Sequence, residues 1–228
     1  MLQIKPFGDG AIHIRFGEEI ADRVVQEVEA FAAQVFRAEG KWLLELVPTY
    51  TSVTIFYKPE LDYRQITEWV YRIYKEESAR TREQAKARLV EIPVCYGSEF
   101  GPDLDYVAKY HGLSVDEVIR KHTAPEYRVY MIGFMPGFPY LGGLDPGLAT
   151  PRLSRPRARV PKGSVGIAGG QTGLYPLESP GGWQLIGRTP WRMFNPWADP
   201  PTLLRSGDRV RFVAINEETY AEIETKNL

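Results

Sequence analysis

Glycine and proline are distributed unevenly along this chain of 228 residues, and the asymmetry constrains the fold more than any other feature. Residues 131–201 contain 12 of the 18 prolines and 13 of the 21 glycines. Proline removes a backbone donor and glycine weakens regular elements, so this segment is poorly suited to long helices or long uninterrupted strands. We therefore expect two parts with different architectures, the second built from short strands and turns.

The first half alternates strand-like and helix-like periodicity. Ile12, Ile14 and Phe16 alternate with other residues as in a half-buried strand, whereas apolar residues between Ile20 and Val35 recur at spacings of three and four. The complete order is strand–helix–strand–strand–helix–strand, which is typical of a ferredoxin-like α/β sandwich and which we expect to form a domain over residues 1–90. The expected strands lie at 11–16, 41–48, 52–59 and 88–96, and the expected helices run from 20 to near 40 and from 62 to about 80.

The second half begins with two short helices and continues as short strands. Apolar residues from Leu104 predict a helix that ends at Gly112, and Ser114 with Glu117 forms a capping-box pattern for the next one. Two helices joined by a glycine resemble a helix-turn-helix, but the second helix is short and no net positive charge would attract phosphates. The short apolar runs from Tyr127 onward favour a small β-barrel. We expect an α+β protein whose second domain, 91–228, is this barrel.

Charge and composition narrow the classes of function. The 28 Lys and Arg residues nearly balance the 29 Asp and Glu residues, so no overall field attracts nucleic acid or an anionic membrane. No apolar run approaches the length of about 20 residues that spans a bilayer, and the charged N-terminal segment does not resemble a signal peptide. The single cysteine, Cys95, excludes an intrachain disulfide and a cysteine-rich zinc site. We expect a cytoplasmic protein that binds neither nucleic acid nor membrane.

Several widespread catalytic motifs are missing from the sequence. It contains no G-x-x-x-x-G-K-[ST], and the glycine series from Gly163 to Gly170 does not match G-x-G-x-x-G, so no recognised motif binds ATP in this chain. Lys162 occupies the first position of the G-x-S-x-G pattern around Ser164, which argues against a serine-hydrolase nucleophile. Because no pair of histidines stands at ligand spacing, we also expect no metal site.

Cationic and planar side chains are the remaining candidates for chemistry. The run TPRLSRPRARVPKG (150–163) carries five cationic residues and no acid. Either it is a solvated positive face, or one or two of its arginines point into a pocket and hold a carboxylate, for which the guanidinium is suited. His122 either caps the end of a helix or enters a site. Gln171, Tyr175 and Trp183 lie beside glycine pairs, which allow either close ligand approach or close core packing.

A second segment, GFMPGFPYLGGLD (133–145), carries four glycines, two prolines and three aromatic residues, which predicts a rigid, shaped loop. This segment and the run from 150 to TP at 189–190 resemble the family of the 5-oxoprolinase B subunit. The stretches FGDGAIHIRFG and EIPVCYGSEFGPDL resemble the same family, so the similarity covers essentially the whole chain. It implies a small α/β N-terminal domain followed by a cyclophilin-like β-barrel.

The resemblance also implies a function. Family members resemble half of a complex with a homologous C subunit, and a further A subunit completes the ATP-dependent opening of 5-oxoproline to L-glutamate. One such chain alone is expected to be inactive. The family also includes the sporulation-kinase inhibitor KipI and allophanate hydrolase-like proteins, so inhibition of a sensor histidine kinase and hydrolysis of a related amide are the alternatives.

The residues of the site are likewise implied by the resemblance. His122 is expected to perform acid/base or oxyanion chemistry, Arg155 to hold anionic groups, and Gln171 to orient the substrate. The loop at 133–145 would form the wall of the pocket and part of the face that meets its partner protein. The expected substrate-binding residues are Phe134, Pro136, Gly137, Phe138, Tyr140, Tyr175 and Arg188.

Overall fold

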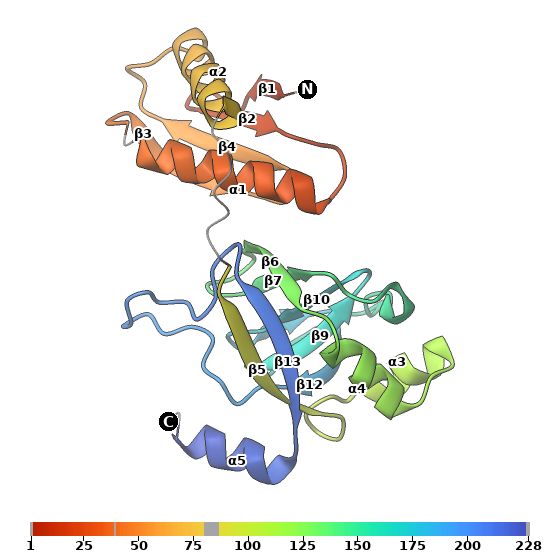
Figure 1. Ribbon diagram of the computed structural model, residues 1–228. Helices are drawn as coiled ribbons and strands as arrows, with labels where there is room; N and C mark the ends of the chain where they lie inside the picture. The colour runs from red at the N-terminus through yellow and green to blue at the C-terminus, as the bar shows by residue number, and fades with distance from the viewer. Residues whose placement is uncertain (1, 39, 80–86, 227–228) are drawn as a thin grey trace. The chain divides into compact units, whose positions relative to one another are not determined.

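The computed structural model of the protein describes residues 2–38, 40–79 and 87–226. The chain divides into two compact units, Met1–Lys86 and Ala87–Leu228 (Figure 1). The sequence predicts a division after residue 90. The strand β5 (Leu89–Tyr96) crosses that position, and it pairs along its length with a strand of the second unit.

The first unit is a four-stranded antiparallel sheet with two helices. The strand order is β1-β2-β4-β3, and the register places Ile12 opposite Ile55 and Ile14 opposite Val53 on one face. These four fully buried residues form one core with the apolar stripes of the two helices, because each stripe recurs at helical spacing. The elements are β1 (Gln3–Pro6), β2 (Ala11–Arg15), α1 (Asp22–Arg37), β3 (Leu43–Pro48), β4 (Ser52–Tyr57) and α2 (Tyr63–Ala79).

The strand order corrects one part of the sequence prediction. The segment 88–96 was expected to close the first sheet, but it forms β5 and belongs to the second unit. The fourth strand of the first sheet is instead β1, which pairs with β2 and precedes the first expected strand. The helices agree with the predicted spans, although the expected end of the second helix at residue 80 lies outside the described residues. Periodicity identifies a strand here but does not identify its partners.

The second unit contains a closed barrel of seven strands in the order β10-β7-β6-β13-β5-β12-β9. Residues from β5, β9 and β13, including Ile92, Ile167 and Phe212, alternate into a shared apolar core. The barrel strands after β5 are short, as the density of glycine and proline predicts. They are β6 (Tyr127–Ile132), β7 (Pro139–Gly142), β9 (Ser164–Ala168), β10 (Gln171–Leu174), β12 (Gln184–Arg188) and β13 (Arg209–Ile215).

Two helices pack against the barrel core. Helix α3 (Leu104–His111) ends at Gly112, which adopts the left-handed conformation with φ 65°. Helix α4 (Val115–Thr123) begins with the predicted capping box, in which Ser114 and Glu117 satisfy each other's backbone donors. Buried residues of both helices, Val107 and Val118 among them, join the core of the barrel. Both predicted helix boundaries are confirmed.

Three further features lie outside the barrel strands. A two-stranded ribbon pairs β8 (Arg157–Val160) with β11 (Ser179–Gly181), and a short 3₁₀ helix η1 spans Pro146–Leu148. The connection from β12 to β13 forms a long loop, and helix α5 (Glu217–Lys226) follows β13 (Figure 1). Over the described ranges, none of the helices has the length and apolar character needed to cross a membrane.

Candidate functional site

The loop that precedes β7 is held in one shape by its own backbone. The Gly133 N–H donates to the Phe138 carbonyl at 3.1 Å, and the Phe138 N–H donates to the Met135 carbonyl at 3.1 Å. Gly137 has φ 80°, and a Cβ there would lie 3.1 Å from the Phe194 Cβ. Glycine therefore allows both the turn and its close packing against the β12–β13 connection.

Four aromatic residues, Phe138, Tyr140, Tyr175 and Trp183, form what we call the aromatic cluster. The Phe138 ring is central, with centroid distances of 4.9 Å to Tyr140, 5.1 Å to Tyr175 and 5.5 Å to Trp183. Its contacts with Tyr175 and Trp183 are edge-to-face, the arrangement that ring quadrupoles favour. Phe138 and Tyr175 are 1% exposed, so their predicted role as substrate contacts would require the cluster to open.

Glycines make room for the aromatic cluster. A Cβ on Gly173 would lie 2.8 Å from the Pro139 carbonyl oxygen and 3.0 Å from a Trp183 ring carbon. A Cβ on Gly181 would lie 2.6 Å from the Tyr175 hydroxyl. Of the two interpretations of the glycine pairs, close packing describes Gly181, whereas a Cβ on Gly169 or Gly170 would meet nothing within 4 Å.

Phe134 is the exposed edge of this region. Its side chain is 63% exposed, and its ring meets Phe138 edge-on at 5.6 Å. The backbone has φ 69°, which is unusual for a bulky residue and costs of order 1–3 kcal/mol. Pro136 is exposed on the same loop. The fold thus holds the large apolar side chain of Phe134 in solvent on a backbone conformation that phenylalanine rarely adopts.

The basic run divides into paired and solvated arginines. Arg157 donates to the Asp103 carboxylate at 2.6 Å, and Arg159 is 2.6 Å from the Glu178 carboxylate. Arg155 is exposed in the loop before β8. The positive charge of Arg152 instead favours the ionised forms of the Tyr140 and Tyr175 phenols, although burial raises the pKa of both. Arg152 therefore lies within electrostatic reach of the aromatic cluster, a relationship that the linear sequence does not reveal.

His122 is fully buried between α4 and the barrel. Its Nδ1 lies 2.8 Å from the Tyr96 hydroxyl, and its Nε2 lies 2.9 Å from the Thr172 hydroxyl. Because Thr172 donates its proton to the Gly166 carbonyl, its oxygen accepts from Nε2–H, and Nδ1 then accepts from Tyr96. Burial lowers the pKa of His122 to about 3. The imidazole is a neutral, fixed tautomer with both nitrogens engaged.

The remaining predicted site residues lie in two places. Gln171 begins β10 and is half-buried, at the turn that joins β9 to β10. Arg188 ends β12, where it donates to the Glu99 carbonyl at 3.1 Å and lies over the Phe100 ring at 5.6 Å. Arg188 also lines a depression of about 320 Å³ beside α5, whose lining contains no other predicted site residue.

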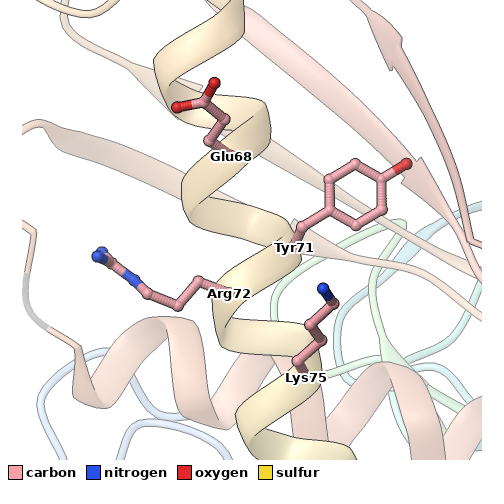
Figure 2. A pocket seen from close by; sticks show the side chains of 4 residues that line it. All are labelled: Glu68, Tyr71, Arg72 and Lys75. Carbon is pink, nitrogen blue, oxygen red and sulfur yellow. The ribbon is translucent and has the colours of Figure 1, made fainter.

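A wider depression of about 520 Å³ lies on α2 in the first unit. Figure 2 shows its four lining side chains projecting from successive turns of that one helix. Their spacing of three and four residues places them on one solvent-facing surface, where charged residues are ordinary. The lining residues are Glu68, Tyr71, Arg72 and Lys75. None of the predicted site residues lies there.

Comparisons with known proteins place this chain in a family. A model of the family described as "Carboxyltransferase domain, subdomain C and D" matches residues 2–204. The 5-oxoprolinase B subunit of Bacillus subtilis is 51% identical over 96% of this chain and 95% of its own length. This chain belongs to the 5-oxoprolinase B-subunit family. The B subunit of Haemophilus influenzae is 40% identical over 93% of this chain and 97% of its own.

Two solved structures also resemble this chain. A conserved uncharacterised protein of Pyrococcus horikoshii is 50% identical, with a TM-score of 0.58, and the match covers 96% of this chain and all of that one. The urea amidolyase of Kluyveromyces lactis is 22% identical, with a TM-score of 0.81, and the match covers 99% of this chain and 15% of that one. At that identity the second likeness shows the fold alone. The family predicted from the loop and glycine pattern is confirmed.

The acidic residue that anchors the basic run, Asp103, is not evident from the local sequence. Asp103 is buried and accepts from Arg157 and, at 2.6 Å, from the Leu185 backbone N–H. These partners are 54 and 82 positions away along the chain. The only local signal was an acid at the start of a helix, which ordinarily indicates a cap rather than an ion pair.

Proposed function

We propose that this chain is the B subunit of an ATP-dependent 5-oxoprolinase, which opens 5-oxoproline to L-glutamate. The observation that carries the proposal is the 51% identity, over nearly the full length of both chains, to a protein named as that subunit. Supporting features are the shaped loop at 133–138, the aromatic cluster and the nearby cationic residues. We also propose that the barrel is cyclophilin-like and that the complex acts in the cytoplasm, where ATP is available.

The reaction explains why several subunits would be needed. A five-membered lactam is a stable planar amide, so hydrolysis at neutral pH requires activation of its carbonyl and stabilisation of a developing oxyanion. ATP can supply the activation by phosphorylation. No recognised phosphate-binding motif occurs in this chain, so we assign ATP binding to another part of the complex.

We propose that this chain contributes a wall to the substrate site. Phe134 and Tyr140 would contact the ring of 5-oxoproline, while Phe138 and Tyr175 support them from the buried side of the aromatic cluster. Arg155, which is exposed, would pair with the substrate carboxylate. Gln171 would orient the substrate from the β9–β10 turn. An open wall of this kind becomes a water-excluding site only when a partner covers it.

The geometry of His122 favours a positioning role over proton transfer. Both ring nitrogens are engaged with Tyr96 and Thr172, and the ring stacks on Phe212 with centroids 4.6 Å apart. A general base must reach the proton that it removes, which this imidazole does not do without leaving both partners. We propose that His122 fixes β10, and with it Gln171, relative to α4.

We propose that the A and C subunits of 5-oxoprolinase are the partners. Phe134 is 63% exposed and Trp197, in the β12–β13 connection, is 91% exposed. The contact of Gly137 with Phe194 joins these two segments, which would therefore offer one apolar surface. Exposed aromatic anchors of this kind are typical of protein interfaces. We assign this surface to the C subunit.

Reconstitution tests the proposed function. This chain, combined with the A and C subunits encoded nearby, is expected to hydrolyse 5-oxoproline only when ATP and all three proteins are present. Three mixtures that each lack one of the proteins serve as controls, and a trio of known activity is assayed in parallel. If the parallel trio is active and this complete trio is not, the assignment is wrong.

A further inference from the structure

The depression beside α5 brings together groups that the proposed function does not use as a set. Its volume of about 320 Å³ is at the lower end of the range for small-molecule sites. Part of its lining comes from α5, which lies beyond residues 2–204 matched by the family model. Its lining includes Lys162, Leu177, Glu178, Arg188, Tyr220 and Glu224.

One residue that lines this depression, Arg188, carries a buried nitrogen without a hydrogen-bond partner in the described part of the chain. Arg188 on β12 is directly opposite Ser164 on β9, so their side chains lie on the same face of the barrel wall. Among the described residues, neither the Arg188 Nε nor the fully buried Ser164 hydroxyl has a hydrogen-bond partner. Buried donors without partners are uncommon, because each forfeits its hydration. The side of the depression formed by Arg188 is therefore polar and incompletely satisfied.

A tight turn brings a second cation beside Arg188. Gly163 has φ 79°, and a Cβ there would lie 2.4 Å from the Thr189 carbonyl oxygen. The Thr189 N–H also donates to the Gly163 carbonyl at 2.9 Å. Only glycine permits this approach, which fastens the turn to the end of β12 and places Lys162 at the rim. Within the part of the chain that the structure describes, no carboxylate forms an ion pair with Lys162.

The opposite side of the depression supplies a carboxylate. Among the residues that the structure describes, the hydrogen-bond contact of Glu224 on α5 is a long one, 3.4 Å from the Tyr220 hydroxyl. Glu178 is less available, because it already lies 2.6 Å from the Arg159 guanidinium. Two cationic residues, Lys162 and Arg188, thus line the same small space as one weakly engaged anion, although Arg188 also donates to the Glu99 carbonyl and interacts with the Tyr220 side chain. This charge arrangement complements a zwitterion rather than a simple anion.

We propose that this depression binds a free α-amino acid. Lys162 and the Arg188 guanidinium hold its carboxylate, and the Glu224 carboxylate holds its ammonium group. Leu177, which is 40% exposed, contacts its side chain. The site does not depend on the proposed function, because it uses neither the loop at 133–138 nor the aromatic cluster.

The test is an NMR titration of the complete, ¹⁵N-labelled chain with L-glutamate as the probe. Saturable shifts are expected at the amides of Lys162, Gly163 and Thr189. N-acetyl-L-glutamate and 5-oxoproline each have a carboxylate but no free ammonium group. We expect them to bind about tenfold more weakly, as the loss of one charge-assisted contact implies.

Variants test the location of the site and distinguish the residue that binds the ligand carboxylate from the residue that binds its ammonium group. Lys162→Gln is expected to weaken L-glutamate binding about tenfold, whereas Lys109→Gln on the exposed surface of α3 leaves it unchanged. Glu224→Gln is expected to remove the preference for L-glutamate over its N-acetyl derivative. Shifts elsewhere in the chain, no saturable shift, or equal affinity for all three probes would overturn the proposal. None of these results bears on the reconstituted hydrolase.

Discussion

The buried imidazole of His122 makes the barrel sensitive to acid in a way that can be calculated. Its pKa falls from an ordinary value of 6.5 to about 3 on folding, because burial penalises the charged form. Between these two values the unfolded chain binds the proton and the folded chain does not. The contribution of the neutral His122 to the free energy of unfolding is therefore fully present above pH 6.5. It is lost as the pH falls towards 3.

The magnitude follows from the width of that window. At pH 5.0 the solution is about 1.5 pH units below the pKa of His122 in the unfolded chain. Each unit corresponds to about 1.36 kcal/mol, so lowering the pH from 7.5 to 5.0 reduces the free energy of unfolding by about 2 kcal/mol through His122 alone. The substitution His122→Phe abolishes this titration but keeps a ring against Phe212. At pH 7.5 it leaves the buried Tyr96 hydroxyl without a partner, which costs about 1–3 kcal/mol.

The parent protein and the His122→Phe variant are expected to converge in their free energies of unfolding as the pH falls. The free energy of unfolding of the second unit is measured in denaturant at pH 7.5 and 5.0, with hydrogen exchange at β9 and β10 reporting on the barrel alone. The double variant Tyr96→Phe/His122→Phe serves as the control, because it removes the orphaned hydroxyl and should recover part of the loss. If the gap between parent and His122→Phe is the same at both pH values, the histidine does not titrate as described.

Three further predictions concern the proposed site and its support. In the reconstituted complex, Arg155→Met is expected to lower kcat/KM about 10- to 150-fold, because one charge-assisted contact is lost, while Tm changes little. Arg159→Met is the matched control, since Arg159 pairs with Glu178. Equal kinetics for both variants would make Arg155 a solvated residue. Gly173→Ala is expected to lower the free energy of unfolding by about 1–3 kcal/mol, because its Cβ would lie 2.8 Å from a backbone carbonyl oxygen. Gly170→Ala, with nothing within 4 Å, should change it by less than about 0.5 kcal/mol, and similar losses at both positions would refute the packing argument. Trp197→Ser is expected to weaken co-elution with the C subunit in size-exclusion chromatography without lowering Tm, and unimpaired co-elution would remove this side chain from the interface.

The sequence predicts local structure in this protein better than it predicts pairing. The capping box at Ser114 and Glu117 and the left-handed Gly112 depend on neighbouring residues, so both boundaries are confirmed. The segment at 88–96 was correctly expected to be a strand. It was assigned to the wrong sheet, since its pairing with β13 depends on residues about 120 positions away.

In the candidate site, too, contacts between residues close in sequence were predicted better than contacts between distant ones. Residues close in sequence, such as Phe134 and Phe138, were expected together and lie together. Arg188 was expected among the substrate-binding residues, and it lines a depression with α5 that includes none of the other predicted site residues, because strand direction rather than composition decides where its side chain points. The partners of His122 come from β5 and β10, and no local pattern around residue 122 indicates either of them.

The pairing of β5 with β13 also decides when the barrel can form during synthesis. These strands are parallel neighbours, yet one begins at Leu89 and the other ends at Ile215, so the barrel stays open until residue 215 has left the ribosome. The first unit has no such dependence, because all of its strands precede residue 58. Each nascent chain therefore carries a completed sheet ahead of a slowly closing barrel with exposed strand edges. That interval, rather than the mature fold, is when this protein is most vulnerable to aggregation and when a chaperone has most to protect.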